Sequence, residues 1–387
     1  MIAGGGTAGH VVPALAIGRA LVERGYDASE IHFVGARRGI DSRLVPPAGF
    51  PLTVLPGRGI VRKLTLQNVV SLAALSVAFV RAVALLARLR PAVVVSMGGY
   101  AAAPAGLAAR ALRVPLVLSE QNAVPTATHR LLRRFAIASA VPFVGTPLPN
   151  PVVTGNPVRP EVLDVDRSEA GKRAARDALG LPAAGVVIAS VGGSLGSRTI
   201  NTAVLGLAAA WRDRDGIAIR HVIGERDWDA SQAAIGDLRG ARLHYQAVRY
   251  EDRMPELLAA ADLVVSRSGG TVAELAVVGR ASILVPLPIA PYDHQAANAQ
   301  VLVRAGAAVM LRDHEATPER LATEIDALLA EPGRLDRMGE AARTVGHPDA
   351  AERVADLVIE HANQPAKLGQ ELASEDRRPW RRARRDR

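Results

Sequence analysis

The sequence predicts two α/β domains, each built on a doubly wound parallel sheet. Short runs rich in β-branched residues alternate with longer Ala- and Leu-rich amphipathic runs. This alternation is typical of parallel sheets that are covered by helices on both faces. The chain also has 387 residues, which is too long for one ordinary core and suits two domains of roughly 150–200 residues each.

Six apolar runs are predicted to be buried strands, and four longer runs are predicted to be helices. The strands are expected at residues 31–35, 92–97, 114–120, 185–193, 261–269 and 281–288. The helices are expected at Pro13–Arg24, Val69–Arg88, Thr199–Trp211 and His294–Ala305. Each half has its own glycine-rich loop between a strand and a helix, so two Rossmann-like halves facing each other across a cleft are the simplest architecture.

The break between the two halves is predicted within residues 147–160. This segment contains five prolines and the turn-forming pair Gly155–Asn156, without a helical period. We therefore expect one domain at residues 1–150 and a second at 151–363, whose closing helices can pack back on the first. From residue 364 the composition becomes polar and basic, so residues 364–387 are predicted to be a disordered tail.

Composition excludes several classes of protein. The chain has no cysteine, which excludes a disulfide framework, a thiolate metal site and a cysteine nucleophile. Residues 377–387 hold seven Arg and one Asp, so only +3 of the net charge of +9 lies elsewhere. Basicity confined to a tail without a folded motif argues against nucleic acid as a partner. The longest apolar run, Val69–Val80, is shorter than the about 20 residues that a membrane-spanning helix needs.

The first glycine loop, Gly4–Gly9, satisfies the pattern GxGxxG. A glycine turn that opens a helix presents free N–H groups and the positive end of the helix dipole, both of which favour a phosphate. Taken alone, the loop allows a dinucleotide site. A dehydrogenase would have an acid at the end of the second strand, whereas Arg37 and Arg38 stand there and could at best serve as an NADP-type arginine.

A second loop, residues 266–274, also follows a predicted strand and opens a helix. We expect Thr271 to be its N-cap, and its backbone N–H groups can hold a diphosphate. Glu274 lies about one turn further on, where a carboxylate can accept hydrogen bonds from both ribose hydroxyls. Any one such loop could be a simple strand-to-helix turn, but three of them at carboxyl ends of strands favour a phosphate-bearing ligand.

Eight motifs, in order along the chain, resemble those of the MurG family. They are GGGTAGH (4–10), SMGGYAAAPAG (96–106), SEQNAVP (119–125), TGNPVR (154–159), GGSLGSRTIN (192–201), RYEDRM (249–254), RSGGTVAE (267–274) and DHQAANA (293–299). Members of this family are inverting glycosyltransferases with the GT-B fold. They transfer GlcNAc from UDP-GlcNAc to the C4 hydroxyl of MurNAc in undecaprenyl-pyrophosphoryl-MurNAc-pentapeptide, a step of peptidoglycan synthesis.

The resemblance implies a role for each matching residue. His10 is similar to the proposed general base, and Gly98, Gly99 and Tyr100 resemble an acceptor-side loop. The residues that resemble contacts to UDP-GlcNAc are Thr7, Ala8, Gly9, Asn122, Arg159, Ser194, Glu251 (through its backbone), Gly270, Thr271, Glu274, His294 and Gln295.

The resemblance also implies partners and a location. It implies UDP-GlcNAc and a lipid-linked MurNAc-pentapeptide as substrates, at the cytoplasmic face of the cell membrane, with the protein bound peripherally to an anionic surface. UDP is already a good leaving group, so the transfer requires no cofactor and no metal, only a base of near-neutral pKa and positive potential at the diphosphate. The three Asp-x-Asp triplets at 164–166, 213–215 and 227–229 are interpreted as structural.

Several alternatives remain open at this point. A UDP-GlcNAc 2-epimerase shares the fold and the donor, although the loops at residues 4–10 and 98–100 favour a transferase. A membrane or nucleic-acid adaptor using the Arg-rich tail would leave the glycine loops unexplained. Leu195 departs from the family's second loop because it cannot hydrogen-bond, and His294 could be only a helix-start residue. The helix at Val69–Leu89 is either a core helix or a face that docks on an anionic leaflet.

Overall fold

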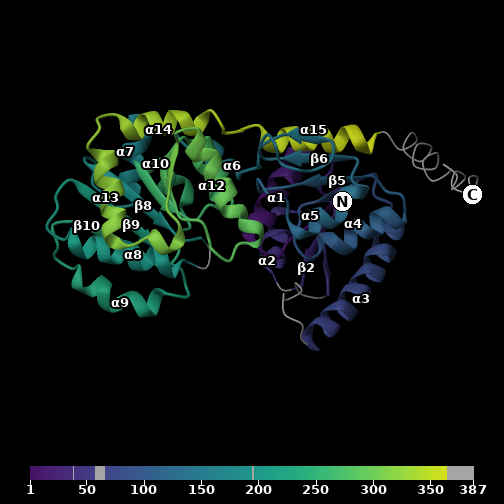
Figure 1. Ribbon diagram of the computed structural model, residues 1–387. Helices are drawn as coiled ribbons and strands as arrows, with labels where there is room; N and C mark the ends of the chain where they lie inside the picture. The colour runs from purple at the N-terminus through teal and green to yellow at the C-terminus, as the bar shows by residue number, and fades with distance from the viewer. Residues whose placement is uncertain (38, 57–65, 194–195, 364–387) are drawn as a thin grey trace, which may run out of the picture.

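The computed structural model describes residues 1–37, 39–56, 66–193 and 196–363, without the side chains of 66–73. The chain forms two α/β units that lie side by side, each with a central sheet between layers of helices (Figure 1). All the strand pairs in both sheets are parallel among the described residues. The predicted fold class is therefore confirmed.

The N-terminal sheet has the strand order β3-β2-β1-β4-β5-β6-β7. Its strands are β1 (Ile2–Ala3), β2 (Phe33–Ala36), β3 (Leu52–Leu55), β4 (Val94–Ser96), β5 (Leu116–Ser119), β6 (Ala138–Val141) and β7 (Pro151–Val153). The central strands are apolar and buried because helices cover both faces of the sheet. Strand β7 extends this sheet three residues beyond residue 150.

The C-terminal sheet repeats the arrangement, with the order β10-β9-β8-β11-β12-β13. Its strands are β8 (Val186–Val191), β9 (Ile217–Val222), β10 (His244–Val248), β11 (Leu263–Ser266), β12 (Ala281–Leu284) and β13 (Ala308–Met310). Two hydrophobic clusters fill its two faces. In both sheets the strand order therefore reverses between the first and the fourth strand, as it does in doubly wound nucleotide-binding sheets.

The helices fall between the strands in sequence. They are α1 (Ala8–Glu23), α2 (Asp41–Leu44), α3 (Leu66–Leu89), α4 (Ala102–Ala111), α5 (Ala127–Leu132), α6 (Pro160–Leu163), α7 (Glu169–Ala178), α8 (Arg198–Ala210), α9 (Trp228–Asp237), α10 (Met254–Ala260), α11 (Thr271–Val278), α12 (His294–Arg304), α13 (Pro318–Leu329), α14 (Arg334–Arg343) and α15 (Ala350–Ala362). Short 3-10 turns occur at Ala28–Glu30, Pro46–Ala48, Arg133–Phe135, Pro291–Asp293 and Asp313–Glu315.

The six predicted strands and four predicted helices are all present, with ends that differ by a few residues. Helix α1 begins five residues earlier than expected, at Ala8. Gly5 and Gly6, at φ 136° and 94°, turn the chain out of β1 so sharply that the helix can start at once. His10 consequently lies in the first turn of α1 rather than in the loop before it.

The chain passes between the two units twice. The first crossing follows β7, and the second lies between α14 and α15, where His347 packs directly against Gly155. Helix α15 then returns to the N-terminal unit, where Val354 and Val358 join its core (Figure 1). Arg24 of α1 donates hydrogen bonds of 2.5 and 3.1 Å to the carboxylate of Asp356, which fastens α15 in place.

Among the described residues, no helix is both long enough and apolar enough to cross a membrane. The longest helix, α3, packs one face on the N-terminal unit through Ala78, Ala82, Leu85 and Leu86.

Candidate active site

Four loops lie at the topological switch points, where the strand order of each sheet reverses. They follow β1, β4, β8 and β11, at the carboxyl ends of neighbouring parallel strands. In doubly wound sheets this is where ligands bind, because the crossovers on either side diverge and leave a crevice. The two N-terminal loops hold residues 4–7, directly before α1, and 97–101, and the C-terminal loop after β11 holds 267–270.

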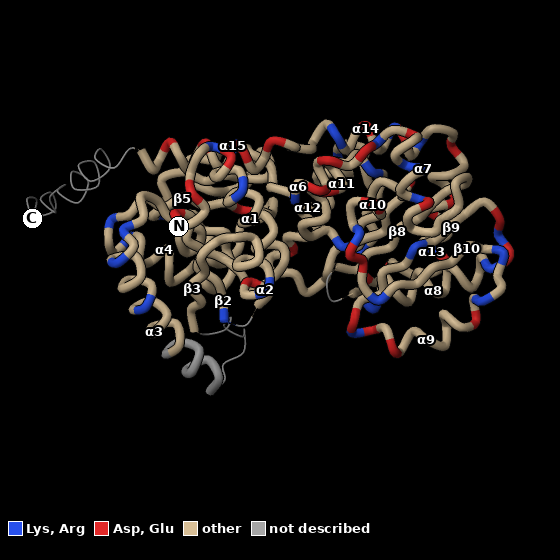
Figure 2. Tube along the Cα trace, turned by 180° about the vertical axis from the view of Figure 1, so that it is seen from behind, with Lys and Arg blue, Asp and Glu red and all other residues tan. Residues whose placement is uncertain are grey.

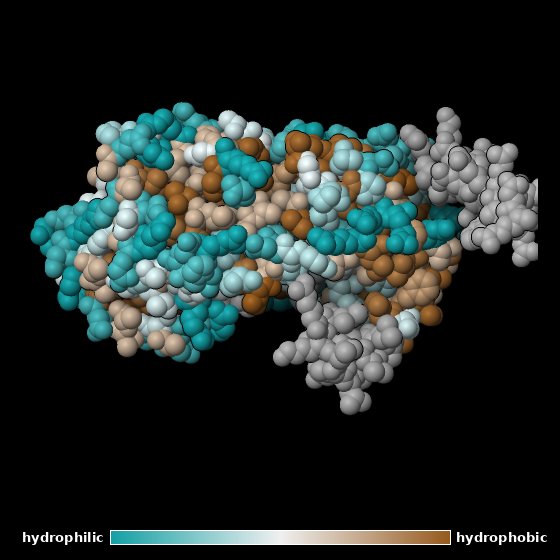
Figure 3. Space-filling model, viewed as in Figure 1, coloured by the Kyte–Doolittle hydropathy of each residue, from teal (hydrophilic) through white to brown (hydrophobic). Residues whose placement is uncertain are grey.

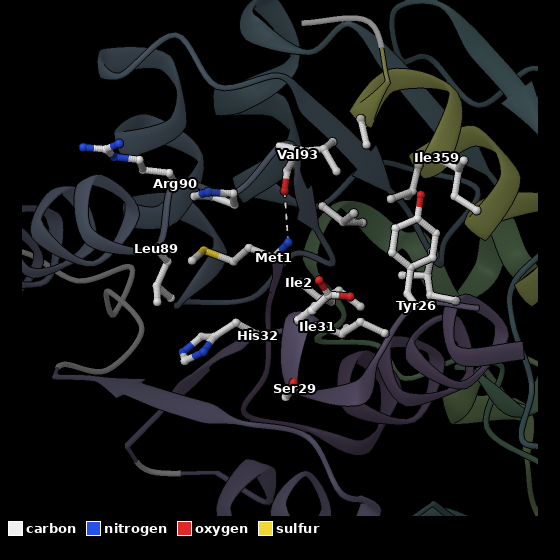
Figure 4. Close-up of a pocket in the computed structure, with 17 residues that line it drawn as sticks. Met1, Ile2, Tyr26, Ser29, Ile31, His32, Leu89, Arg90, Val93 and Ile359 are labelled. Carbon is white, nitrogen blue, oxygen red and sulfur yellow. Dashed lines mark hydrogen bonds between the residues drawn. The ribbon is translucent and has the colours of Figure 1, made fainter. Parts of the chain in front are cut away.

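One cavity of the N-terminal unit does not belong to this site. It has a volume of about 420 Å³ and is lined by Met1, Ile31, Val93 and residues of α15 (Figure 4). The buried amino group of Met1 donates to the carbonyl of Val93 over 3.0 Å, and burial lowers the pKa of this amino group to about 5. These residues precede β1, β2 and β4, so the cavity lies at the amino ends of the strands, opposite the glycine loops.

The two N-terminal loops pack against each other so closely that glycine is required. A Cβ at Gly99 would lie 2.6 Å from the carbonyl oxygen of Gly5, and Gly98 and Gly99 have φ of 82° and 76°. Tyr100 donates from its hydroxyl to the carbonyl of Pro56 over 3.1 Å. The predicted acceptor-side loop therefore borders the loop that carries Thr7, Ala8 and Gly9.

His10 lies between these loops and is half-buried. Its Nδ1 is 3.0 Å from the hydroxyl oxygen of Thr7, and its Nε2 would lie 3.4 Å from a Cβ at Gly98. Loss of solvent around the ring lowers the pKa of His10 to about 4, an effect that Glu120 opposes and His129 and His294 reinforce. The pKa of His10 thus lies below the near-neutral value expected of the base, and at pH 7 the imidazole is neutral and able to accept a proton.

Glu120 is a second titratable group near His10, but its carboxylate is engaged by other partners. It is 1% exposed and accepts hydrogen bonds from His129 at 2.7 Å and from the backbone of Gln121, Asn122 and Thr126. Burial raises the pKa of Glu120, but the charge and hydrogen bonds of His129 outweigh burial and bring it to about 2. Glu120 organises the loop that carries Asn122.

Asp41 supports the first loop and was missed from the sequence. This carboxylate is 2% exposed and accepts a hydrogen bond of 2.8 Å from the N–H of Gly6. Gly5, Gly35 and Gly39 leave no room for a Cβ beside it. A single Asp in a polar stretch carries no sequence signal for this contact, because its partner lies 35 residues away.

On the C-terminal side, the loop after β11 leads into α11. The N-cap of α11 is Gly270 rather than Thr271, and no side chain caps the helix. Thr271 is instead the first helical residue, so the prediction of its capping role is wrong. The N–H groups of Val272 and Ala273 donate to the carbonyls of Gly269 and Gly270, whereas no side chain caps the N–H groups of Gly270 and Thr271, and Gly270 is exposed.

Glu274 lies in the first turn of α11 and is 8% exposed. Nε and Nη2 of Arg159 approach its Oε1 at 3.2 and 3.1 Å. Burial raises the pKa of Glu274, and Arg159 opposes this shift. Two residues that were predicted separately therefore meet and form an ion pair.

Helix α12 begins beside this loop with His294 and Gln295. Nδ1 of His294 donates to the carbonyl of Pro291 over 2.8 Å, and Oε1 of Gln295 accepts from the N–H of Leu287 over 2.9 Å. Tyr292 and Asp293 just before them have φ of 58° and 52°, a strained backbone that sets the direction of the helix. His294 is near enough to His10 for its charge to lower the pKa of that residue.

The two units make direct contact beside the site. Asn298 of α12 hydrogen-bonds Asn122 and Ala123 of the N-terminal unit. The guanidinium of Arg130 lies 3.7 Å from the ring centroid of Tyr292, a favourable cation–π distance. The N-terminal loop at 120–126 and the start of α12 therefore meet face to face.

Two further predicted residues are less informative. Glu251 is 6% exposed and its carboxylate pairs with Arg220 at 2.6 Å, so its side chain is already engaged. Ser194, together with the unusual Leu195, lies outside the described residues. Among the residues that the structure describes, no cluster of three metal-binding side chains is found, and Asp227 of the third triplet is held by Arg226 and Asn201.

Comparison with known proteins identifies the family. The glycosyltransferase family 28 N-terminal domain matches residues 1–141, and the family 28 C-terminal domain matches residues 187–354. A UDP-N-acetylglucosamine–N-acetylmuramyl-(pentapeptide) pyrophosphoryl-undecaprenol N-acetylglucosamine transferase of Desulforudis audaxviator is 37% identical, over 92% of this chain and 97% of the relative. The equivalent transferase of Symbiobacterium thermophilum is 39% identical, over 94% and 96%. The chain belongs to the MurG family, within glycosyltransferase family 28.

Solved structures agree with this membership. Acinetobacter baumannii MurG superposes with a TM-score of 0.71 at 30% identity, covering 93% of this chain and 98% of that one. The UDP-GlcNAc 2-epimerase of Neisseria meningitidis gives a TM-score of 0.62 at 14% identity, over 93% and 98%, a similarity that shows the shared fold alone. The GT-B fold and a glycosyltransferase activity are thus confirmed for this MurG-family chain.

Proposed function

We propose that this chain transfers GlcNAc from UDP-GlcNAc to the C4 hydroxyl of MurNAc in undecaprenyl-pyrophosphoryl-MurNAc-pentapeptide, with inversion at the anomeric carbon. The observation that carries this proposal is the similarity to transferases named for this reaction, at 37–39% identity over more than nine-tenths of the chain. We assign the acceptor to residues 1–150 and the donor to residues 151–363.

The donor would lie against α11. Its diphosphate would meet the uncapped N–H groups at Gly270 and Thr271, where the helix dipole favours negative charge. Glu274 would accept hydrogen bonds from the ribose, with Arg159 holding the carboxylate charged beside it. The further donor contacts that we propose come from His294, Gln295 and Asn122 to the sugar, Ser194 to the UDP portion, and the backbone of Glu251 to uracil.

The acceptor would lie on the N-terminal loops, with its diphosphate beside Thr7, Ala8 and Gly9 and with Gly98, Gly99 and Tyr100 on its other side. In this position its C4 hydroxyl can reach His10, which we propose as the general base. The low pKa of His10 keeps the ring unprotonated at neutral pH. The negative charge of a bound diphosphate would raise that pKa and so strengthen the base when the substrates are in place.

No metal is needed in this scheme. Charge develops on the departing UDP, and the N-terminus of α11 supplies preorganised N–H donors where it appears. Each Asp-x-Asp triplet has a carboxylate with another partner: Asp166 accepts from the N–H of Ser168, Asp215 pairs with Arg242, and Asp227 pairs with Arg226.

A membrane contact follows from the lipid-linked acceptor, and α3 is the surface that we propose for it. Val77 and Val80 on its outer face are 48% and 65% exposed, and Arg81 and Arg88 beside them are exposed as well. Helix α3 has no Asp or Glu, and Figures 2 and 3 show basic and hydrophobic residues together in this part of the N-terminal unit. Such a face suits the anionic, cytoplasmic leaflet.

One assay separates this function from its main alternative. UDP release is measured from UDP-GlcNAc with and without a lipid-linked MurNAc-pentapeptide acceptor. Release that depends on the acceptor, with a disaccharide product, is the expected result. Release of UDP without any acceptor would contradict the proposal and favour an epimerase-type reaction on the same fold.

A further inference from the structure

Asn298 is a buried amide that joins the two units beside the proposed donor site. It lies on the second turn of α12 and is 1% exposed. Its Oδ1 accepts from the N–H of Ala123 at 2.8 Å, and its Nδ2 donates to Oδ1 of Asn122 at 3.1 Å. The same Nδ2 donates to the carbonyl of Ser268 at 3.1 Å. Two of these three bonds cross between the units, and the third holds the glycine loop before α11.

The chemistry of the neighbours fixes the orientation of both amides. The carboxylate of Glu120 can only accept, so the group of Asn122 that lies 2.9 Å from it must be the NH₂. The oxygen of Asn122 therefore faces Asn298, which must present its own NH₂. The backbone N–H of Ala123 then requires the oxygen of Asn298 at the opposite side. Reversal of either amide would place like groups in contact at several positions.

The orientation of the Asn122 side chain, and so the direction of its second N–H, depends on Asn298. One hydrogen of its NH₂ is used by Glu120, and the other is available to a ligand in the half-exposed position that Asn122 occupies. We propose that Asn298 is a positioning residue: it aims this N–H at the donor sugar and ties the loop at 122–123 to the donor loop at Ser268. The inference rests on the proposed function, because it takes the sugar of UDP-GlcNAc as the ligand of Asn122.

The proposal predicts a specific pattern of affinities. Asn298→Asp keeps the shape of the side chain and the oxygen that accepts from Ala123. It replaces the NH₂ by a carboxylate oxygen, which repels Oδ1 of Asn122 and the carbonyl oxygen of Ser268. We expect it to weaken UDP-GlcNAc binding at least about tenfold, while UDP binding changes less than about twofold, since UDP lacks the sugar. Asn298→Ala provides a second variant that introduces no charge. Isothermal titration with UDP and with UDP-GlcNAc measures both affinities.

A double-mutant cycle tests whether Asn298 acts through Asn122. Asn122→Ala should weaken UDP-GlcNAc binding by a similar factor, and the double variant Asn122→Ala/Asn298→Ala should be little worse than either single variant. Asn201→Ala is the matched control. Asn201 is also a buried amide, 3% exposed, but its bonds to Ile223, Asp227 and His221 stay within the C-terminal unit. It should lower the melting temperature without changing the ratio of the UDP-GlcNAc and UDP affinities.

The outcomes are distinguishable. Equal losses of UDP and UDP-GlcNAc affinity in both Asn298 variants, or additive effects in the cycle, would overturn the positioning role while leaving the transferase activity of the wild type intact. A wild type that releases no UDP with the lipid-linked acceptor would instead overturn the proposed function itself.

Discussion

Replacement of Glu274 by alanine tests the donor site most directly. The change removes a first-turn carboxylate that is 8% exposed and that we place against the ribose. Two charge-assisted hydrogen bonds to ribose hydroxyls would be lost, each worth roughly 1.5–3 kcal/mol. Because Oε1 already binds Arg159, we take the lower end of that range. A loss of about 3 kcal/mol corresponds to an increase of about 100-fold in KM for UDP-GlcNAc.

The folded state should tolerate this change. Burial raises the pKa of Glu274, so the folded chain holds a proton there more tightly than the unfolded chain, and burial of the carboxylate opposes folding at neutral pH. Arg159 is left without its partner, but its side chain is 36% exposed and water can solvate it. We therefore expect the melting temperature to change by only about 3 °C or less.

Initial rates at varied UDP-GlcNAc and saturating acceptor give KM, and titration with UDP checks the affinity independently. Glu274→Gln keeps the volume but not the charge, so its KM should rise by a smaller factor, about tenfold. Glu256 is the first-turn acid of α10, and Glu256→Ala is the control with an unchanged KM. A Glu274→Ala enzyme with a normal KM and a normal fold would remove Glu274 from the donor site.

Four other predictions follow from the same contacts. His10→Ala should lower kcat by about 10²–10⁴ with UDP affinity unchanged, and a loss of only a few-fold would exclude His10 as the base. Since the pKa of His10 is about 4, kcat/KM should fall on the acid side near pH 4; a fall near pH 6.5 would contradict a lowered pKa for the base. Activity should persist in EDTA, and complete loss that Mg²⁺ restores would revive a metal-dependent mechanism. Val80→Asp should reduce sedimentation with anionic vesicles and activity on a long-chain acceptor, but it should leave activity on a short-chain analogue unchanged. Deletion of residues 377–387 should instead weaken only the salt-sensitive part of vesicle binding. Vesicle binding that survives Val80→Asp would exclude α3 as the docking surface.

The choice of Val80 shows where a sequence pattern is insufficient. From the sequence, Phe79 was the natural residue to change in this helix, because it is the largest apolar side chain there. The structure turns Phe79 toward the core of the N-terminal unit, so a charge at that position would disturb folding rather than docking. Helical periodicity gives two apolar faces in an Ala-rich helix, and only the packing decides which one is covered.

The strands that were predicted differ physically from those that were missed. Central strands such as β8 and β11 are apolar on both faces, so a continuous hydrophobic run marks them. Strand β9 carries Arg220 and His221, which look exposed in the sequence but are buried by their pairing with Glu251 and Tyr245. Strand β7 begins at a proline in a segment that resembles a linker, a position that only an edge strand permits.

In the candidate site, too, some features could be predicted from the sequence and others could not. The glycine loops were predictable because positive φ and close backbone approach leave a direct mark on the sequence. The pairing of Arg159 with Glu274 was not, since 115 residues separate them. The pKa of His10 could not be predicted from the sequence either, because it depends on desolvation by a second loop and on a histidine from the other unit.

That dependence bears on how the enzyme protects its donor. Burial and the nearby His294 lower the pKa of His10 to about 4, so the ring holds protons weakly and is a poor base. A water molecule that reached the donor sugar would therefore be deprotonated by His10 only weakly. In the arrangement that we propose, the acceptor would bring a diphosphate close to Thr7–Gly9, and its negative charge would strengthen His10, so that base strength and the correct nucleophile would arrive together. We expect hydrolysis of UDP-GlcNAc without acceptor to stay far slower than transfer, and a His10-dependent hydrolysis of comparable rate would refute this coupling.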